Sequence, residues 1–235
     1  MTVLLLRLAG PLQSWGDSSR FTQRATANAP TKSGVLGMLA AAQGRRRTDP
    51  VEDLVQLRFG VRIDQPGSLL RDFHTTHDVN GKPQPLSNRF YLSDAVFLAG
   101  LEGDSATINL IADSIKRPKF PLYLGRRACP PDQPMLLGIT ADKLDVSLRS
   151  TEWQAAAWFR SRRQNRRDGY RARILIDAPN VFNSAEYERY VVRDVPVSWD
   201  PEHREYEWRD IVETSVELLP PSVTLHDPLA VLGEE

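Results

Sequence analysis

The stretch VQLRFGVRI, from Val55 to Ile63, alternates apolar residues with polar residues or glycine at every second position. Side chains on a β-strand point alternately to opposite faces, so this pattern predicts a strand with one buried face. Upstream, an apolar run over 3–9 ends at Gly10-Pro11 and predicts an earlier strand that closes in a turn. We expect both stretches to belong to one sheet.

Two helices are predicted on either side of the Val55 strand. The first covers 33–43, where Thr31 or Ser33 can cap the start and Gly44 can end the helix. The second covers 108–115, where apolar residues recur at positions i, i+3, i+4 and i+7. Both helices carry an apolar face that can pack on the sheet.

Two further strands complete the first part of the chain, one over 90–99 and one over 135–139. The predicted order is then β-α-β-β-α-β, which indicates an α+β fold class with a ferredoxin-like (RRM-like) N-terminal domain. Residues 66–88 contain scattered Gly, Pro and Asn without apolar periodicity, so a long loop is expected there. This fold serves many functions, so it does not by itself identify one.

The rest of the chain is expected to form a smaller, β-rich region. Thr151 and Gln154 have the spacing of a capping box ahead of a short helix. Strands are predicted over 171–178 and 187–197. We therefore divide the chain into an N-terminal domain, 1–148, with an insertion at about 66–90, and a C-terminal region, 149–235.

Composition is that of an ordinary soluble protein, with 235 residues, 41% hydrophobic residues and a mean hydropathy of -0.39. The apolar run near the N-terminus is far shorter than the ~20 residues that cross a bilayer, and no basic segment precedes it. A single cysteine, Cys129, excludes an internal disulfide. We expect a cytoplasmic protein without membrane contact.

Charge is unevenly distributed although the net charge is +0. Only four of the 30 Lys and Arg residues follow Arg173, against fourteen of the 30 Asp and Glu residues. The basic part is rich in arginine, whose planar guanidinium group suits bidentate phosphate contacts. Such a division favours a polyanionic partner on one face, although a GC-rich genome also raises arginine content.

The motifs of common enzymes are incomplete in this sequence. Lys32-Ser33 at a helix start resembles a phosphate loop, but the glycines of the Walker pattern are missing, so a plain helix cap is the better interpretation. His74 and His77 lack further ligands at zinc-like spacing, and no nucleophile elbow is present. We predict no catalytic residues, no metal and no cofactor.

The segment 160–173 contains seven arginines and one aspartate, with aromatic residues beside them. Basic and aromatic side chains together suit single-stranded nucleic acid, because phosphates bind the cations and bases stack on the rings. A solvated loop is an equally good interpretation of the same residues. The two remain open from the sequence.

Four separated motifs carry a family resemblance over about the first 140 residues. They are RLAGPLQSWG (Arg7 to Gly16), PTKSGVLG (Pro30 to Gly37), RDFHT (Arg71 to Thr75) and LYLGRRACP (Leu122 to Pro130). In this order they resemble the CasD family, the RAMP-superfamily subunits of the type I-E CRISPR surveillance complex Cascade. The 160–173 segment lies outside the resemblance.

The resemblance implies a non-catalytic subunit of a hetero-oligomeric ribonucleoprotein in antiviral defence. Such a subunit binds the repeat-derived 5′ tag of the guide RNA and caps the filament of CasC backbone subunits beside the large CasA subunit. The insertion at about 66–90 then corresponds to a thumb-like element of the ferredoxin-like domain.

The resemblance also implies which residues contact RNA. Arginines would hold phosphates, Trp15 and Tyr91 would stack on bases, and Gln13 would read base edges of an unpaired tag. Carried over position by position, the expected RNA-binding residues are Gln13, Trp15, Lys32, Ser33, Arg71, His74, Arg89, Tyr91, Arg126 and Arg127.

An alternative function comes from type I-C relatives, which cut the repeat RNA by metal-independent acid–base chemistry. A metal-independent endoribonuclease needs a base for the 2′-hydroxyl and an acid for the leaving oxygen. His74 with Tyr91 or Lys82 would have to supply them. We favour the non-catalytic subunit, because the motifs resemble the type that does not cut RNA.

Overall fold

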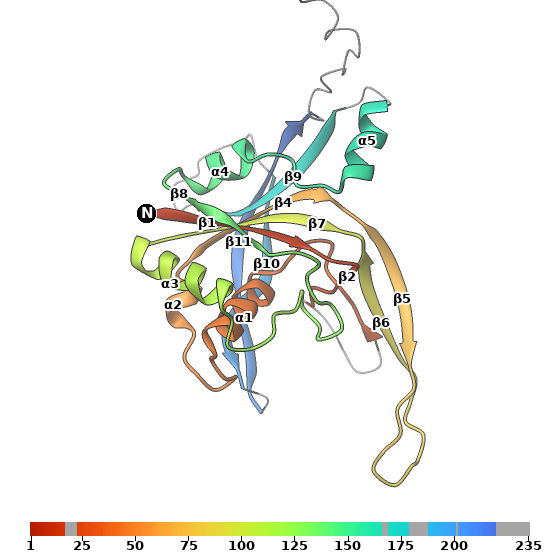
Figure 1. The fold of residues 1–235 in the computed structure, drawn as a ribbon. Helices are drawn as coiled ribbons and strands as arrows, with labels where there is room; N and C mark the ends of the chain where they lie inside the picture. Colours follow the sequence, from red (N-terminus) through yellow and green to blue (C-terminus); the bar gives the residue numbers. More distant parts are fainter. Residues whose placement is uncertain (17–22, 166–168, 179–187, 201, 220–235) are drawn as a thin grey trace, which may run out of the picture.

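The chain is described by a computed structural model over residues 1–16, 23–165, 169–178, 188–200 and 202–219 (Figure 1). Within these ranges the elements are β1 (Thr2–Ala9), β2 (Leu12–Gln13), β3 (Gln23–Arg24), α1 (Lys32–Gln43), α2 (Glu52–Val55), β4 (Arg58–Gln65), β5 (Ser68–His74), β6 (Ser87–Ser93), β7 (Val96–Gly103), α3 (Ser105–Lys116), β8 (Leu136–Thr140), α4 (Leu144–Ser150), α5 (Ala157–Asn165), β9 (Tyr170–Asp177), β10 (Glu188–Trp199) and β11 (Arg204–Leu218). The class is mixed α+β, as expected, and its regular structure is mostly sheet.

Most strands join one seven-stranded sheet in the order β10-β11-β9-β4-β7-β1-β8, with antiparallel neighbours throughout. The strands predicted at 3–9, 55–63 and 135–139 correspond to β1, β4 and β8. A smaller sheet is built on β6, which pairs with β5 on one side and with the short β2 and β3 on the other.

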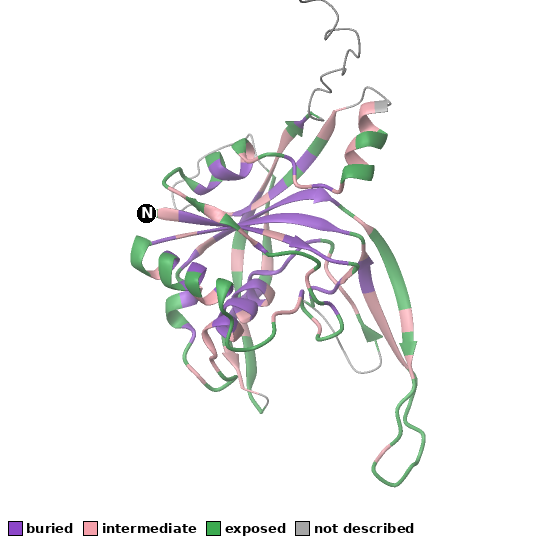
Figure 2. Cartoon of the chain, in the orientation of Figure 1, coloured by how far each residue is buried: buried purple, intermediate pink, exposed green. Residues whose placement is uncertain are grey.

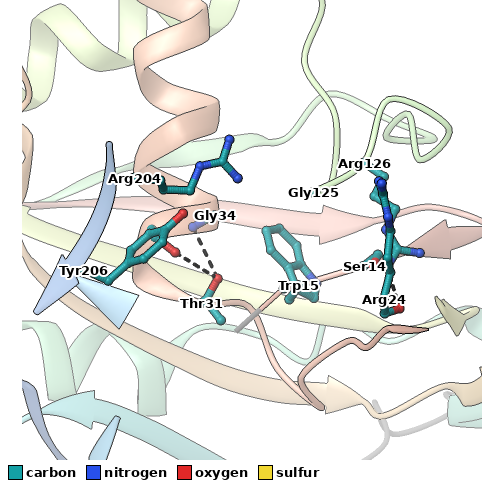
Figure 3. A pocket seen from close by; sticks show the side chains of 11 residues that line it. Ser14, Trp15, Arg24, Thr31, Gly34, Gly125, Arg126, Arg204 and Tyr206 are labelled. Atoms are coloured by element: carbon teal, nitrogen blue, oxygen red, sulfur yellow. Dashed lines mark hydrogen bonds between the residues drawn. The ribbon is translucent and has the colours of Figure 1, made fainter. Parts of the chain in front are cut away.

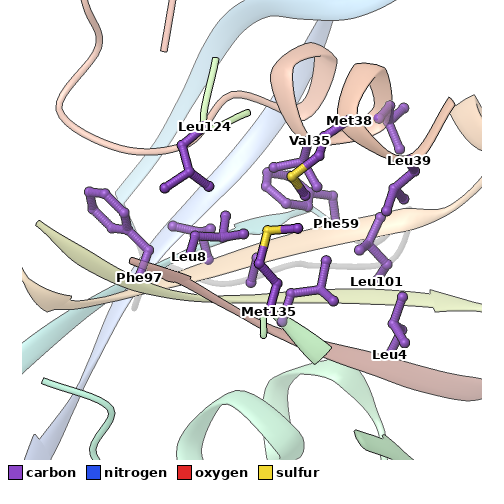
Figure 4. Packing of buried hydrophobic residues seen from close by; sticks show 14 of the residues in the cluster. Leu4, Leu8, Val35, Met38, Leu39, Phe59, Phe97, Leu101, Leu124 and Met135 are labelled. Carbon is purple, nitrogen blue, oxygen red and sulfur yellow. The ribbon is translucent and has the colours of Figure 1, made fainter. Parts of the chain in front are cut away.

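The two faces of the large sheet carry different helices. On β1, Leu4, Leu6 and Leu8 face the main core, which α1 and α3 cover. Figure 4 shows Leu4 and Leu8 in this core together with Val35 and Leu39 of α1. The alternate residues Val3 and Leu5 face a second cluster under α4. Each fully buried leucine contributes about 1.5–3 kcal/mol through loss of water contact. Figure 2 shows this burial concentrated along the central strands.

Helix α1 has the predicted boundaries to within one residue. The Thr31 hydroxyl oxygen accepts a 3.2 Å hydrogen bond from the main-chain N–H of Gly34, which makes Thr31 the N-cap. Gly44 ends the helix in the left-handed conformation, at φ +82°, where glycine avoids a Cβ clash. The second predicted helix is α3, and its buried residues include the predicted apolar stripe.

Two predicted strand boundaries are wrong. Val55 ends the short helix α2, and β4 begins only at Arg58, so the alternating pattern starts later than the sequence suggested. The predicted strand over 90–99 is two strands, because Asp94 has φ +56° and breaks the chain between β6 and β7. The break lets β6 leave the large sheet and join the small one.

The expected loop over 66–88 is largely a β-hairpin. Strands β5 and β6 pair from Ser68 opposite Ser93 to His74 opposite Ser87, and residues 75–86 form the tip. The hairpin extends away from the body of the molecule (Figure 1). Leu69 and Phe73 on β5 are each about two-thirds exposed, at 64% and 66%. The sequence prediction failed here because this hairpin buries too little to show periodicity.

The chain after 149 continues the large sheet, because β9 pairs with β4. Thr151 is the C-cap of the unpredicted helix α4, so the proposed capping box was wrong and the next helix, α5, begins at Ala157. Strands β9 and β10 match the predicted strands, whereas the long β11 was missed. Pro196 lies in the edge strand β10 between two register shifts.

Buried Arg62 on β4 fixes the end of α4 and the residues after it relative to the sheet. Its guanidinium donates to both carboxylate oxygens of Asp64, at 2.6 and 2.9 Å, and its other N–H groups donate to main-chain carbonyls of Leu148, Thr151 and Glu152. All five donors of the guanidinium are therefore used.

Across the described part of the chain, no helix is long and apolar enough to cross a membrane.

Candidate nucleic-acid interface

A cavity of about 570 Å³ opens at the N-terminal end of α1 (Figure 3). This volume lies within the range of about 300–1,000 Å³ that is usual for ligand pockets. Side chains and main chain from five separate segments meet there. The lining residues are Ser14, Trp15, Gly16, Arg24, Thr31, Ser33, Gly34, Gly125, Arg126, Arg204 and Tyr206.

A second cavity of about 360 Å³ continues along α1 and shares Ser33, Gly34, Gly125, Arg204 and Tyr206 with the first. The two together are called the α1 groove from here on. The second cavity adds Gly37, Met38, Ala40, Ala41, Arg45, Arg46, Arg47, Pro121, Tyr123 and Trp199. Gly37 lies beside Trp199, because a Cβ there would be in ordinary van der Waals contact with the indole ring, at 3.7 Å.

The α1 groove is strongly basic. Its described lining residues include six arginines and no Asp or Glu. Arg45 pairs with Asp53 beside the groove; this hydrogen bond, opposed by burial, raises the pKa of Arg45 and lowers that of Asp53. Arg24, Arg46 and Arg204 are exposed and form no ion pair with a described residue. These guanidinium groups can receive phosphates.

The positive end of α1 is already partly neutralised. Asp194 on β10 accepts a 2.7 Å hydrogen bond from the main-chain N–H of Lys32, and Thr31 caps Gly34. A carboxylate at this position interacts favourably with the helix dipole. The positive potential of the groove therefore comes from its arginine side chains rather than from the helix end.

Arg126 forms a fixed wall of the groove. Its guanidinium donates to the main-chain oxygen of Phe90 at 3.1 Å and to that of Arg24 at 2.7 Å. It also lies 4.8 Å from the ring centre of Tyr91. The Arg126 side chain thus joins the loop 122–130 to β6 and β3, which positions Arg24 at the edge of the cavity.

Gly125 allows two of the sequence motifs to touch. Its φ is +91°, and a Cβ at this position would lie 1.7 Å from the main-chain oxygen of Ser14. The main-chain N–H of Ser14 donates to the Leu124 oxygen at 3.1 Å.

Cys129 in the same loop is buried, and burial raises the pKa of its thiol, which disfavours a reactive thiolate.

Gln13 and Trp15 have structural roles in this fold, and their predicted contacts with bases remain untested predictions. The Gln13 amide nitrogen donates to the main-chain oxygens of Leu8 and Ala95, at 3.1 and 2.7 Å, and its oxygen accepts from the Trp15 indole at 3.1 Å. Both side chains are 0% exposed. Trp15 packs under Gly34, where a Cβ would meet the indole at 2.8 Å.

Lys32 is also buried, and its predicted RNA contact is replaced by an ion pair. Its ammonium lies 3.0 Å from Asp177 on β9. Ser33, by contrast, lies in the lining of the groove although it is 91% covered. Of the four predicted residues in the first two motifs, Ser33 is the one best placed to meet a ligand.

The predicted residues of the hairpin lie outside the lining of the α1 groove. Arg71 donates to the Asn88 side chain at 3.0 Å, and His74 pairs with Asp72 at 2.7 Å. Arg89 on β6 is opposite Asp72. Tyr91 is 3% exposed beneath Arg126, and Arg127 is exposed beside it. The structure thus gathers Ser33, Trp15 and Arg126 at the groove.

The His74–Tyr91 pair of the alternative function is not assembled in this structure. Tyr91 pairs with Leu70, four residues along β5 from His74. Four residues of a strand span about 13 Å, and the Tyr91 hydroxyl group belongs to a buried residue. Among the described residues, no group of three or more His, Cys, Asp or Glu side chains is arranged to hold a metal ion.

Sequence reasoning missed several lining residues. Arg24 follows a segment without a motif, and Arg204 and Tyr206 lie in the acidic C-terminal part. Their alternate positions on β11 place both on the side that faces α1. A strand prediction over 204–208 was the one signal that could have found them.

Three comparisons place this chain among CRISPR proteins. The family model described as CRISPR-associated protein (Cas_Cas5) matches residues 3–212. The chain is 34% identical to CRISPR system Cascade subunit CasD of Escherichia coli (strain K12), over 57% of this chain and 70% of the relative.

Two solved structures resemble it over most of their length. One, described as a crystal structure of Cas protein, has a TM-score of 0.70 and 35% identity, and the match covers 93% of this chain and 97% of that chain. The other comes from a CRISPR RNA-guided surveillance complex, with a TM-score of 0.73, 32% identity and coverage of 92% and 90%. The resemblance expected from the four motifs is confirmed, and the chain belongs to the CRISPR-associated Cas5 family.

Proposed function

We propose that this chain is a non-catalytic CRISPR Cascade subunit that binds the repeat-derived 5′ tag of the guide RNA in the α1 groove and caps the backbone filament. The observation that carries the proposal is the groove itself, with six arginines, no acidic residue among its described lining residues, and the aromatic rings of Tyr123, Trp199 and Tyr206. The relatives named above support the assignment to a Cascade complex.

The groove suits an unpaired strand better than a duplex. Single-stranded RNA is bound where cations follow the backbone and rings lie against splayed bases. Exposed Arg24 lies in the first cavity, Arg46 and Arg47 line the second, and Arg204 lies where the two meet. A strand following α1 would place its phosphates near Arg24, Arg204 and Arg46 in turn and its bases near Tyr206.

The fold supports the rest of the proposal. The antiparallel order β4-β7-β1-β8, with α1 and α3 on one face, fits a ferredoxin-like RAMP domain over 1–148. The hairpin β5–β6 fits the thumb-like insertion at about 66–90, and the region 149–235 supplies one wall of the groove. Exposed Leu69 and Phe73 on the hairpin support a contact with a CasC or CasA subunit.

Co-expression tests this proposal. The chain is produced with a CasC-type subunit and a repeat-spacer transcript, without a dedicated repeat endonuclease, and the ends of the copurifying RNA are sequenced. We expect uncut transcript that is protected at the repeat segment upstream of the spacer. The double variant Arg24→Gln, Arg204→Gln should lose most of this RNA, whereas Lys116→Gln, exposed on α3, should retain it.

A second experiment decides between the subunit and the endoribonuclease: the purified chain and its His74→Ala variant are incubated with repeat RNA in EDTA. RNA cut within the repeat by the unmodified chain, with cutting lost in His74→Ala, would make this chain the processing enzyme. Intact RNA in both proteins supports the non-catalytic subunit in the cytoplasmic ribonucleoprotein.

A further inference from the structure

Helix α5 exposes an aromatic and basic surface that the α1 groove does not use. Trp158 is 52% exposed, and Arg162, one turn further along, is exposed on the same side of the helix. The sequence of α5 contains three arginines and no acidic residue. Arg160, Arg162 and Arg163 form no ion pair with any residue that the structure describes. Trp158 and Arg162, the exposed pair, are called the α5 surface below.

The inner side of α5 holds this surface in place. Phe159 packs edge-on against Trp153 at 6.0 Å and against Tyr170 at 5.6 Å. The guanidinium of Arg163 lies 5.5 Å from the ring centres of both Phe159 and Tyr170. Trp158 in turn meets Phe159 edge-on at 5.6 Å, so one side of its ring is supported while about half of the side chain faces solvent.

The α5 surface lies on the other side of the large sheet from the α1 groove. On β9, Ala172 belongs to the cluster around Trp153, and Ile174 to the cluster under α4. Leu175, whose side chain points the opposite way, packs against the core that α1 covers. Figure 1 shows α4 and α5 on one side of the sheet and α1 on the other. A strand in the groove therefore does not reach Trp158 without passing around the sheet.

We infer that the α5 surface binds single-stranded nucleic acid as a second site, separate from the α1 groove. Trp158 provides a preformed platform on which a base stacks, and Arg162 takes an adjoining phosphate. Stacking on an aromatic ring tolerates any base, and arginine binds any phosphate, so the site selects an unpaired strand without selecting its sequence. The site uses the helical start of the arginine-rich segment 160–173, of which residues 166–168 lie outside the described residues.

Oligothymidylate DNA is the probe, because it is unpaired and has no relation to the repeat. Binding of a fluorescent oligothymidylate to the full chain is measured by anisotropy over a series of salt concentrations. Trp158→Ala should weaken binding at least about fivefold, the effect of losing one stacked base. Arg162→Gln should reduce the slope of log K against log salt by about 0.7, the effect of one phosphate contact.

Matched controls are available on other surfaces. Trp208 on β11 is 65% exposed, and Arg117 is exposed at the end of α3. Trp208→Ala and Arg117→Gln should bind the probe as the unmodified chain does. Equal affinity and equal salt slope in the α5 variants and these controls would overturn the inference.

The site is separable from the RNA site by variants of the groove. The double variant Arg24→Gln, Arg204→Gln should leave oligothymidylate binding intact. If the groove variant abolishes probe binding, the strand lies in the groove and the inference is wrong, whatever the fate of the proposed function. If α5 variants instead lose another subunit and keep the probe, the α5 surface is a protein contact and the inference fails.

Discussion

The main-chain N–H of Lys32 donates a 2.7 Å hydrogen bond to the Asp194 carboxylate, which joins the first turn of α1 to β10. Asp194 also accepts two hydrogen bonds from Arg209, at 2.6 and 2.9 Å. Arg209 reaches Asp177, which pairs with the Lys32 ammonium. This closed set of four charges holds the β10–β11 hairpin against α1, so the wall of the groove that carries Arg204 is fixed to the helix beneath it.

Removing Asp194 should strongly destabilise the protein. Burial disfavours the charge on Arg209, but Asp194 and Asp177 outweigh burial and raise its pKa. Asp194→Ala leaves Arg209 without this partner, and breaking a buried ion pair costs about 3–5 kcal/mol. Urea unfolding measures the loss of unfolding free energy.

Asp210 supplies the matched control for Asp194. It also pairs with an arginine, Arg189, but its side chain is 44% exposed. Exposed ion pairs contribute at most about 1 kcal/mol, so Asp210→Ala should change stability little. Equal losses in the two variants would show that the buried network does not hold the hairpin.

Gly125 should resist substitution because of its close contact with Ser14. Gly125→Ala introduces strain at φ +91° and a Cβ that would lie 1.7 Å from the Ser14 oxygen. Gly81 has a similar φ of +80° but nothing within 4 Å of its Cβ position. Gly81→Ala should therefore cost about 1–2 kcal/mol from backbone strain, and Gly125→Ala about 1–3 kcal/mol more from overpacking. Thermal unfolding of both variants tests this difference, and a smaller cost at Gly125 would contradict it.

Glu213 on β11 should make stability depend on pH in acid. A hydrogen bond from Arg173 is the largest cause that holds the pKa of Glu213 below its ordinary value of 4.5, against the opposing effect of burial. A carboxylate with a lowered pKa stabilises the fold fully above its unfolded pKa and loses this effect as the pH falls through the folded value.

The stability gap between the unmodified chain and Glu213→Gln should accordingly be constant above about pH 4.5 and close below it. The measurement is the unfolding free energy of both proteins in urea, at pH values from about 2.5 to about 7. This range spans the ordinary pKa values of carboxyl groups. Glu207→Gln, exposed on the same strand, is the control. A gap that widens in acid would contradict the role of the Arg173 pair.

Local signals allowed much of the N-terminal fold to be predicted. Thr31 and Gly44 mark the ends of α1 because capping depends on neighbouring residues. Phe59 to Ile63 alternate because the apolar side chains face the main core, but Gly60 and Arg62 on the other face are buried as well, against the predicted single buried face. The break at Asp94 was missed because its positive φ is imposed by two sheets that β6 and β7 join separately. No local pattern contains that requirement.

The site was harder to predict because its residues come together only through long-range contacts. A polar Gln13 two residues before an aromatic Trp15 is typical of a surface motif. In the structure Gln13 instead bonds to Leu8 and Ala95, Trp15 bonds to Gln13, and both side chains lie in the core. Arg204 lies in an acidic stretch and reaches the groove only because β11 joins the sheet. The burial of Gln13 and the position of Arg204 both depend on contacts between strands that are distant in the sequence.

The salt dependence of RNA binding by Arg204→Gln tests the central claim most directly. Binding of the repeat-derived RNA segment to the full chain is measured over a series of salt concentrations, beside the unmodified chain and the exposed-surface variant Arg117→Gln. If RNA lies in the α1 groove, Arg204→Gln weakens binding and reduces the slope of log K against log salt by about 0.7, and Arg117→Gln changes neither. Parallel slopes and equal affinities for all three proteins would contradict RNA binding in the groove.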